Sequence, residues 1–487
     1  MSCNVVGGTY DDAQRRSENS IHGCLRFSSM FLVIPIVSAL AVPSGAQIYR
    51  WDNHKLISGT ENITPSPGAN FSNLDLEYAN IEEPDLDNAN FSCDDMTGAI
   101  ITNSSLVNAD FSNSNLTEII FLPVDDLSGA NFTDANLTVA NLYGCNLTNT
   151  NFTDAIVNGA EIGVQIAFSQ LASTASYQQK NLAGIHLTGD MTGWNLSGQN
   201  LSGAWLTGTT LTNANLTGAT VLGTNFGGEI ANGFTFSQLA STASYQQGNL
   251  SGIDLSSCEL QGWDFSKQNL AGALFVNSGL RGANFADANL ADVNFDTADL
   301  TDADLRGASG VGPLLNNLVY NTIQPDGTIQ GLNLGPDETL IVRNNPIAIT
   351  VTESATFDPK STLQMLLDRN WTSAIQFSPG VTPQLVGTLD LEFADDVDPA
   401  GLLGETFQLF DWNCPLAADN EFSAITTAPG FTFDTSNLYT TGSITLISIP
   451  EPASATLIVT AGLALTTCRR RKSHAPTSMR RNLQKNS

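Results

Sequence analysis

Basic side chains are what this sequence has least of. Only 19 of its 487 residues are Lys or Arg, against 48 Asp and Glu, and the formal net charge is −29. Seven of the 19 lie beyond Cys468, so nine basic residues and two histidines, His54 and His186, remain between positions 47 and 449. Such a surface repels nucleic acid phosphates, and we expect no nucleic acid partner.

Reactive and metal-binding groups are also scarce. The seven cysteines form no C-x-x-C pair, and their spacing predicts neither a disulfide nor a metal site. A nucleophile needs a nearby base, and the two histidines stand far from any catalytic motif. The acidic group Asp395, Asp396 and Asp398 lacks the spacing of a calcium loop and is interpreted as an acidic surface cluster. We therefore expect no catalytic, cofactor-binding or metal-binding residues and no enzyme.

The N-terminal region carries an export pattern. An apolar run at Phe27–Val42 follows three arginines and precedes the small residues 44–46. This order predicts a signal peptide with its n-region over residues 1–46, cleaved by signal peptidase between Ala46 and Gln47. Residues 47–66 are then expected to be a linker.

The C-terminal region carries a second pattern over residues 450–472, which predicts a membrane anchor. An apolar run follows Pro450, Glu451 and Pro452, and a basic cluster comes next. That cluster consists of Arg469, Arg470, Arg471 and Lys472. The run is slightly shorter than the roughly 20 residues of a full membrane span, and the cluster favours a cytoplasmic end, with residues 473–487 as a basic tail.

The order of these three features resembles the PEP-CTERM signal of exosortase substrates. The resemblance implies that an exosortase-type membrane transpeptidase recognises the Pro-Glu-Pro segment and removes the helix. The protein would then reach the cell surface or extracellular matrix, or stay anchored in the membrane by the helix if processing fails. The fifteen residues that follow the basic cluster depart from this pattern.

Between the two ends, large apolar residues recur every five positions, with a small residue two places earlier. The clearest members are Leu270, Phe285, Leu290, Phe295, Leu300 and Leu305. A period of five fits neither a helix nor a strand. It predicts that each unit turns one corner of a coil, with these residues pointing inward, and that coils stack to bury them.

The pattern resembles the A-[D/N]-L-x-x motif of the pentapeptide repeat family. The resemblance implies an all-β, right-handed quadrilateral β-helix with four units per coil. The units divide into residues 67–165 and residues 166–310, about forty in all. They predict about ten coils and a rod about 50 Å long.

One phrase, "FSQLASTASYQQ", occurs at Phe168–Gln179 and again at Phe236–Gln247, where it interrupts the five-residue series. Its apolar stripe predicts a helix of two to three turns with Ser169 as N-cap. Two interpretations stay open: the helix covers an exposed end of the β-helix, or it forms a ligand site around Tyr177 and Tyr245.

Residues 311–449 lose the period of five and contain β-branched and aromatic runs between turn residues. They predict an antiparallel β-rich domain, or an irregular continuation of the solenoid that ends in one. This region resembles the β-rich segment before PEP-CTERM tails in planctomycete surface proteins.

Two functions fit the sequence. The first is an exported structural or binding protein of the cell surface, with an unknown protein or polysaccharide as partner. The alternative is a pentapeptide protein that mimics DNA and binds a topoisomerase, because residues 70–310 hold 26 acidic and four basic side chains. The export pattern favours the first.

Overall fold

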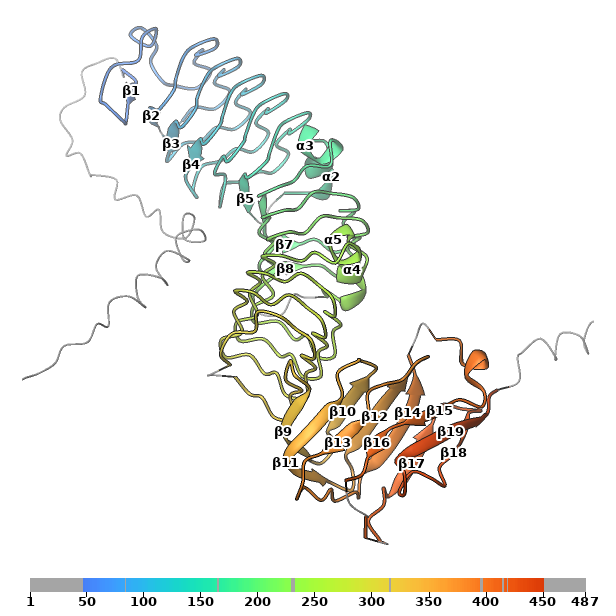
Figure 1. Ribbon diagram of the computed structural model, residues 1–487. Helices are drawn as coiled ribbons and strands as arrows, with labels where there is room; N and C mark the ends of the chain where they lie inside the picture. Colours follow the sequence, from blue (N-terminus) through green and yellow to red (C-terminus); the bar gives the residue numbers. More distant parts are fainter. Residues whose placement is uncertain are drawn as a thin grey trace, which may run out of the picture.

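A computed structural model describes residues 47–83, 85–163, 166–228, 233–314, 317–394, 397–413, 416–417 and 419–450. The predicted signal peptide, residues 1–46, falls outside these ranges, and so does the predicted sorting signal, residues 450–472, except for Pro450. Among the described residues no helix is long and apolar enough to cross a membrane. Figure 1 shows an elongated coiled body followed by a second β-rich body.

The elongated body is an all-β solenoid of about 13 turns. Bridges join residues 20 positions apart, as in Asn90 with Asp110 and Asp95 with Asn115, and recur every five residues along the chain. Each bridge is doubly bonded: Phe91 N donates to Asp110 O at 2.7 Å, and Asp110 N donates to Ala89 O at 2.9 Å. The prediction of about ten turns is too low, because it counted only five-residue units. The two inserts and the residues after 310 also complete turns.

Only short stretches of the solenoid qualify as strands. They are β1 (Tyr49–Arg50), β2 (Ala79–Glu82), β3 (Ile100–Thr102), β4 (Ile120–Phe121), β5 (Glu161–Gly163), β6 (His186–Leu187), β7 (Gly189–Asp190) and β8 (Thr209–Thr210). Tight turns separate them, and the residue two places after most central apolar residues adopts positive φ, as at Asn108 (φ 58°) and Gly129 (φ 69°). Asn, Asp and Gly tolerate that backbone best, and they dominate this position of the repeat.

The repeat's large apolar residues fill the interior. The residues predicted as core, Leu270, Phe285, Leu290, Phe295, Leu300 and Leu305, have exposed fractions between 0% and 6%. Phe71, Phe91, Phe111 and Phe132 stack on one another, with successive ring centroids 4.7 to 5.0 Å apart. Cys145 and Cys258 take the small inward position and are buried. Stacked coils thus bury what no single unit could bury alone.

The N-terminal end of the solenoid is closed by the segment expected to be a linker. Strand β1 pairs antiparallel with β2, and Ile48 and Ile57 are buried against the first coil. Trp51 Nε1 donates to Gly98 O at 2.8 Å. The expectation of a linker at residues 47–66 is therefore wrong: because these residues cover apolar surface at the first coil, they form an ordered cap.

Each copy of the duplicated phrase folds as two short helices. They are α2 (Phe168–Ala172) and α3 (Ala175–Gln178), then α4 (Phe236–Ala240) and α5 (Ala243–Gln246). The predicted single helix with Ser169 as N-cap is wrong, because Thr174 takes an extended conformation and its Oγ1 accepts from Tyr177 N at 3.1 Å. Thr174 thereby ends one helix and caps the next.

The inserts lie within the stack of coils and cover neither end of it (Figure 1). Ala175 N donates to Ala155 O in the preceding coil, and Tyr177 Oη donates to Asn195 O in the following one. Each insert therefore replaces part of the wall between two coils, and the expectation that it covers an exposed end is wrong.

After residue 323 the chain alternates between two parallel sheets. The first, in spatial order, holds β16 (Phe410–Asp411), β13 (Ile375–Phe377), β11 (Ile349–Phe357) and β9 (Thr328–Leu334). The second holds β10 (Thr339–Arg343), β12 (Thr362–Leu367), β14 (Thr388–Phe393) and β17 (Ala424–Thr427). A separate core lies between them, with Leu340, Val351 and Leu389 among its buried members.

Among the described residues after 323, only the last sheet is antiparallel; it contains β15 (Thr406–Gln408), β19 (Ser443–Ser448) and β18 (Thr432–Asp434). A short 3-10 helix, η1 (Pro399–Leu402), precedes it. The antiparallel domain predicted for residues 311–449 is therefore wrong for the two larger sheets. The predicted alternative, a continuation of the solenoid ending in an antiparallel sheet, describes the region. Alternation of apolar residues does not distinguish the two pairings, because both bury one side of each strand.

Candidate ligand-binding surface

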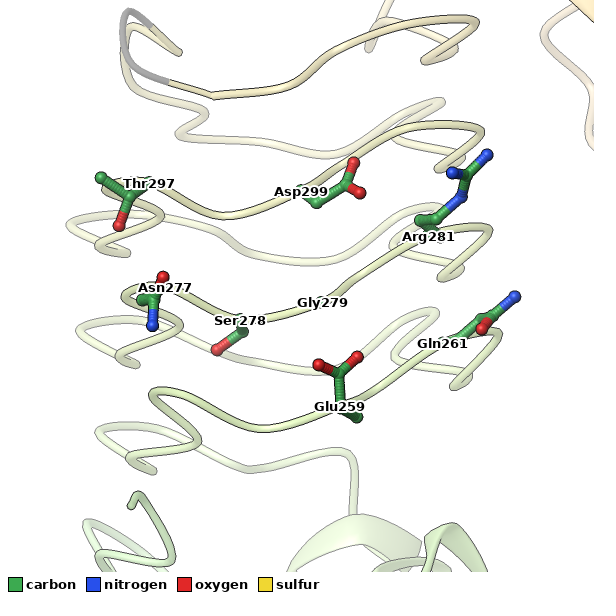
Figure 2. A pocket seen from close by; sticks show the side chains of 8 residues that line it. All are labelled: Glu259, Gln261, Asn277, Ser278, Gly279, Arg281, Thr297 and Asp299. Carbon is green, nitrogen blue, oxygen red and sulfur yellow. The ribbon is translucent and has the colours of Figure 1, made fainter. Parts of the chain in front are cut away.

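A shallow hollow of about 250 Å³ lies on one face of the solenoid. Figure 2 shows it spanning three successive coils; its lining consists of Glu259, Gln261, Asn277, Ser278, Gly279, Arg281, Thr297 and Asp299. Bridges join Glu259 to Gly279 and Gly279 to Asp299, so these three residues form one column across the coils. The repeat thus places one carboxylate on each side of a glycine.

The glycine creates the hollow. A Cβ atom at Gly279 would stand 2.4 Å from Glu259 Oε2, so any side chain there would displace the carboxylate. Ser278 Oγ donates to Leu255 O at 2.8 Å and is thereby committed to the wall. The hollow offers polar groups to a ligand but contains no nucleophile paired with a base.

Arg281 forms the rim nearest to the C-terminal body. Its Nη2 lies 3.3 Å from Asp302 Oδ2 and 3.1 Å from Glu338 Oε1. Asp302 also accepts from Asn321 Nδ2 at 2.9 Å, and burial raises the pKa of this carboxyl above its usual value. The guanidinium therefore joins the two bodies, and Glu259 and Asp299 set the charge of the hollow.

Comparison with known families identifies the repeats. The model of pentapeptide repeats matches eight copies within residues 85–118, 126–160, 195–228, 249–285 and 278–309. The matched segments are pentapeptide repeats, and the solenoid of residues 85–309 that contains them is called the pentapeptide-repeat domain below. The described coils, with four bridges per turn and inward residues every five positions, have the geometry that this repeat requires.

Several solved structures are similar to the pentapeptide-repeat domain. HetL of Nostoc sp. strain PCC 7120, involved in heterocyst differentiation regulation, is 21% identical over 50% of this chain and 91% of its own, with a TM-score of 0.15. A pentapeptide repeat protein of the Arabidopsis thaliana thylakoid lumen is 27% identical over 21% and 66%, with a TM-score of 0.17. QnrB1, a plasmid-mediated fluoroquinolone resistance protein, is 18% identical over 50% and 90%, with a TM-score of 0.12. No curated protein sequence matches significantly.

The predicted sorting residues mostly lie outside the described ranges. Glu451, Pro452, Arg469, Arg470, Arg471, Lys472 and Ala46 belong to this group. Pro450 is described: it is exposed and lies close to Gly430, where a Cβ atom would stand 2.8 Å from Pro450 Cγ. Gln47 is also exposed, and its Oε1 accepts from Tyr49 Oη at 2.7 Å.

The two histidines and the acidic group near residue 398, which the sequence analysis considered, lie apart from one another. His54 lies in the N-terminal cap, whereas His186 lies on an outer face beside Glu161. Asp398 Oδ1 accepts from Ala400 N at 3.0 Å and so caps η1; its neighbours Asp395 and Asp396 fall outside the described residues. Across the described ranges, no group of three or more His, Cys, Asp or Glu side chains could hold a metal ion.

The duplicated inserts build matching aromatic clusters. Phe168 packs against Tyr177 and Trp194, with ring centroids 5.7 and 5.5 Å away. In the second copy, Phe236 packs against Tyr245 and Trp263, both at 5.6 Å. Tyr245 Oη donates to Asp264 O at 2.8 Å, and burial raises the pKa of this phenol to about 12. The two tyrosines thus link neighbouring coils in the wall.

Proposed function

We propose that this protein is a non-catalytic structural or ligand-binding rod of the cell surface or extracellular matrix. The observation that carries the proposal is the continuous apolar core, which runs from Ile48 to Ala308. Outside it, polar side chains bond to one another from coil to coil, as Asn131 Nδ2 does to Asp110 Oδ1 at 2.9 Å. Such an arrangement supports an extended, stiff body and leaves little room for an enclosed active site.

Export is the second part of the proposal and rests on the two ends of the sequence. Signal peptidase would cut after Ala46, and an exosortase-type transpeptidase would act at Pro450, Glu451 and Pro452. Pro on each side of Glu451 removes two backbone donors and restricts φ, which favours an extended segment that an enzyme can bind. The mature protein would then begin at Gln47 and lack the basic cluster.

Fractionation of the source cells tests this proposal. We expect the protein in the envelope or the medium, accessible to protease added to intact cells, and mass spectrometry should place its C-terminus near Pro452. An intact C-terminus carrying Arg469, Arg470, Arg471 and Lys472 would mean that the protein stays anchored in the membrane and is not released. Full-length protein confined to the cytosol would overturn export altogether.

Topoisomerase binding is the second candidate. It is favoured by the charge of positions 70–310, which hold 26 acidic residues and only four basic ones. A negatively charged rod can compete with DNA for a basic protein surface. A supercoiling assay of DNA gyrase with the full chain separates the two functions. Dose-dependent inhibition at low salt that persists at physiological salt would favour this candidate, and no inhibition would remove it.

A further inference from the structure

Three aromatic side chains form a strip on one outer face of the pentapeptide-repeat domain. The rings of Tyr143 and His186 are nearly parallel, with centroids 6.4 Å apart and planes at 20°. Those of His186 and Trp205 are 5.7 Å apart and tilted by 56°. Backbone bridges place Glu161, His186 and Trp205 in one column of successive coils. The strip therefore follows the long axis of the solenoid.

The strip is open to solvent. Tyr143 is 47% exposed, the His186 side chain is 25% exposed, and Trp205 is only partly buried. In the next two coils this column carries Asn225 and Asp254, and farther along it holds both polar and aliphatic residues, among them Asn141, Ile120 and Leu274. The core lies on the opposite side of the wall, so packing of the interior does not account for aromatic residues here.

Hydrogen-bonding groups stand beside His186 and in the coil beyond Trp205. Glu161 Oε1 lies 3.3 Å from His186 Nδ1, and Glu161 Oε2 accepts from Asn141 Nδ2 at 3.0 Å. Beyond Trp205, Asn225 Oδ1 accepts from Thr207 Oγ1 at 3.0 Å. A carboxylate can accept about four hydrogen bonds, so Glu161 keeps capacity for a ligand hydroxyl.

We propose that this strip, formed by Tyr143, Glu161, His186 and Trp205, binds a neutral polysaccharide that lies along the solenoid axis. An aromatic ring presents a flat apolar face with negative π-density, against which the C–H face of a sugar packs. The ring spacing of 5.7 to 6.4 Å is comparable with the length of one sugar unit in an extended chain. Glu161 and the flanking amides would accept or donate to sugar hydroxyls.

Charge decides between neutral and anionic polymers. The excess of acidic residues in positions 70–310 repels a polyanion, and Glu161 lies within the strip itself. An uncharged glycan meets no such barrier. This inference names the partner class of the proposed surface function and rests on that function for its biological setting.

Native affinity electrophoresis of the purified full chain tests the inference. The gels contain hydroxyethyl cellulose, laminarin or glucomannan as neutral glycans, and alginate as the anionic comparison. We expect retardation by at least one neutral glycan and none by alginate. Loss of one stacked ring in Trp205→Ala or Tyr143→Ala should weaken binding about three- to tenfold.

Tyr320→Ala is the matched control, because this tyrosine is 70% exposed and lies outside the strip. Circular dichroism melts of all variants confirm that they fold. Migration unchanged by every neutral glycan, or equal retardation of wild type and both strip variants, would overturn the inference. Because binding is measured on purified protein, its outcome does not depend on whether the fractionation experiment finds export.

Discussion

Single residues of the repeat differ sharply in what they contribute to stability. Leu300 is fully buried, and truncating it leaves a cavity. Leu300→Ala should therefore lower the free energy of unfolding by about 2–5 kcal/mol. Thermal or urea denaturation measures the change. Gln261→Ala, at an exposed position of a nearby coil, is the control and should be nearly neutral; equal losses in both variants would contradict the assigned register.

The neighbouring Asp302 shows where residue-level prediction failed. The repeat pattern predicts an outward, nearly neutral side chain at this position, as for Asp299. Asp302 is instead 4% exposed and bonded to Arg281 and Asn321. The segment that follows the last repeat covers it, and no feature of the five-residue unit reveals what a later segment will cover.

A buried carboxyl makes the stability depend on pH. Asp94 occupies a small inward position, and its Oδ1 accepts from Leu74 N at 2.8 Å. Within the described part of the chain, its Oδ2 is buried without a partner. Burial raises the pKa of Asp94 to about 7. The folded protein therefore holds a proton that the unfolded chain releases near its ordinary pKa of about 4.

Proton linkage determines whether folding stability rises or falls with pH. A raised carboxyl pKa stabilises the fold fully below the unfolded pKa of about 4, and this contribution is lost as the pH rises through about 7. Its size is at most about 4 kcal/mol. Asp94→Asn should flatten the stability profile between these pH values and raise the melting temperature at pH 8. Asp95→Asn, at the exposed neighbouring position, should keep the wild-type slope; parallel profiles for wild type and Asp94→Asn would exclude Asp94 as the cause.

At the scale of elements, the duplicated inserts hold the wall of the solenoid through a few side chains. Gln238 Nε2 donates to Leu211 O and Ala214 O, both at 2.8 Å, and Gln170 makes the matching pair of bonds in the first copy. The bonds to Ala214 O and Thr150 O satisfy carbonyl groups that the interrupted coil leaves without strand partners, whereas Leu211 O also accepts from Ala214 N at 3.0 Å. The need for them explains why this part of the phrase is the same in both copies.

Gln238→Ala should therefore destabilise the protein by about 1–3 kcal/mol, because it leaves the Ala214 carbonyl group unpaired and removes one of the two donors to Leu211 O. Gln246→Ala is the control: it removes the same side chain from an exposed position of the same insert. Chemical denaturation compares the two. If both variants unfold at the same denaturant concentration, the bonds of Gln238 do not stabilise the wall.

At this scale the sequence predicted the coils and located both interruptions, but it did not predict how the inserts fold. Period-five residues such as Phe285 and Leu290 could be placed because each unit repeats the same local geometry. The break at Thr174 could not, since its extended backbone depends on the coil beneath the insert. The aromatic strip was also missed, although Trp205 stands where the repeat usually has Asn or Asp, and that departure was a readable signal.

On the scale of the whole molecule, one buried arginine of the solenoid, Arg306, bonds to the C-terminal body. Arg306 and Asp304 are 0% and 1% exposed, and Nη2 of the arginine lies 2.6 Å from Oδ2 of the aspartate. The same guanidinium donates to Arg343 O, Ile347 O and Ser373 Oγ at 2.8 to 3.1 Å. Five donors of one side chain thus serve both bodies. The sequence shows Arg306 only as an outward residue of the last unit, so this role depends on residues 37 to 67 positions away.

Removing this arginine should loosen the connection between the two bodies. Arg306→Met would leave the Asp304 carboxylate buried without its partner and deprive two carbonyl groups of their donor, at a cost of about 3–5 kcal/mol. We expect a lower melting temperature and earlier proteolytic cleavage near residues 311–327 than in wild type. The control Arg369→Met removes an exposed guanidinium from the C-terminal body. The double variant Arg306→Met/Asp304→Leu should recover part of the loss, because it removes the unpaired charge as well. A single variant that melts and is cleaved like the control would show that packing of the sheets, and not the hydrogen bonds of Arg306, holds the bodies together.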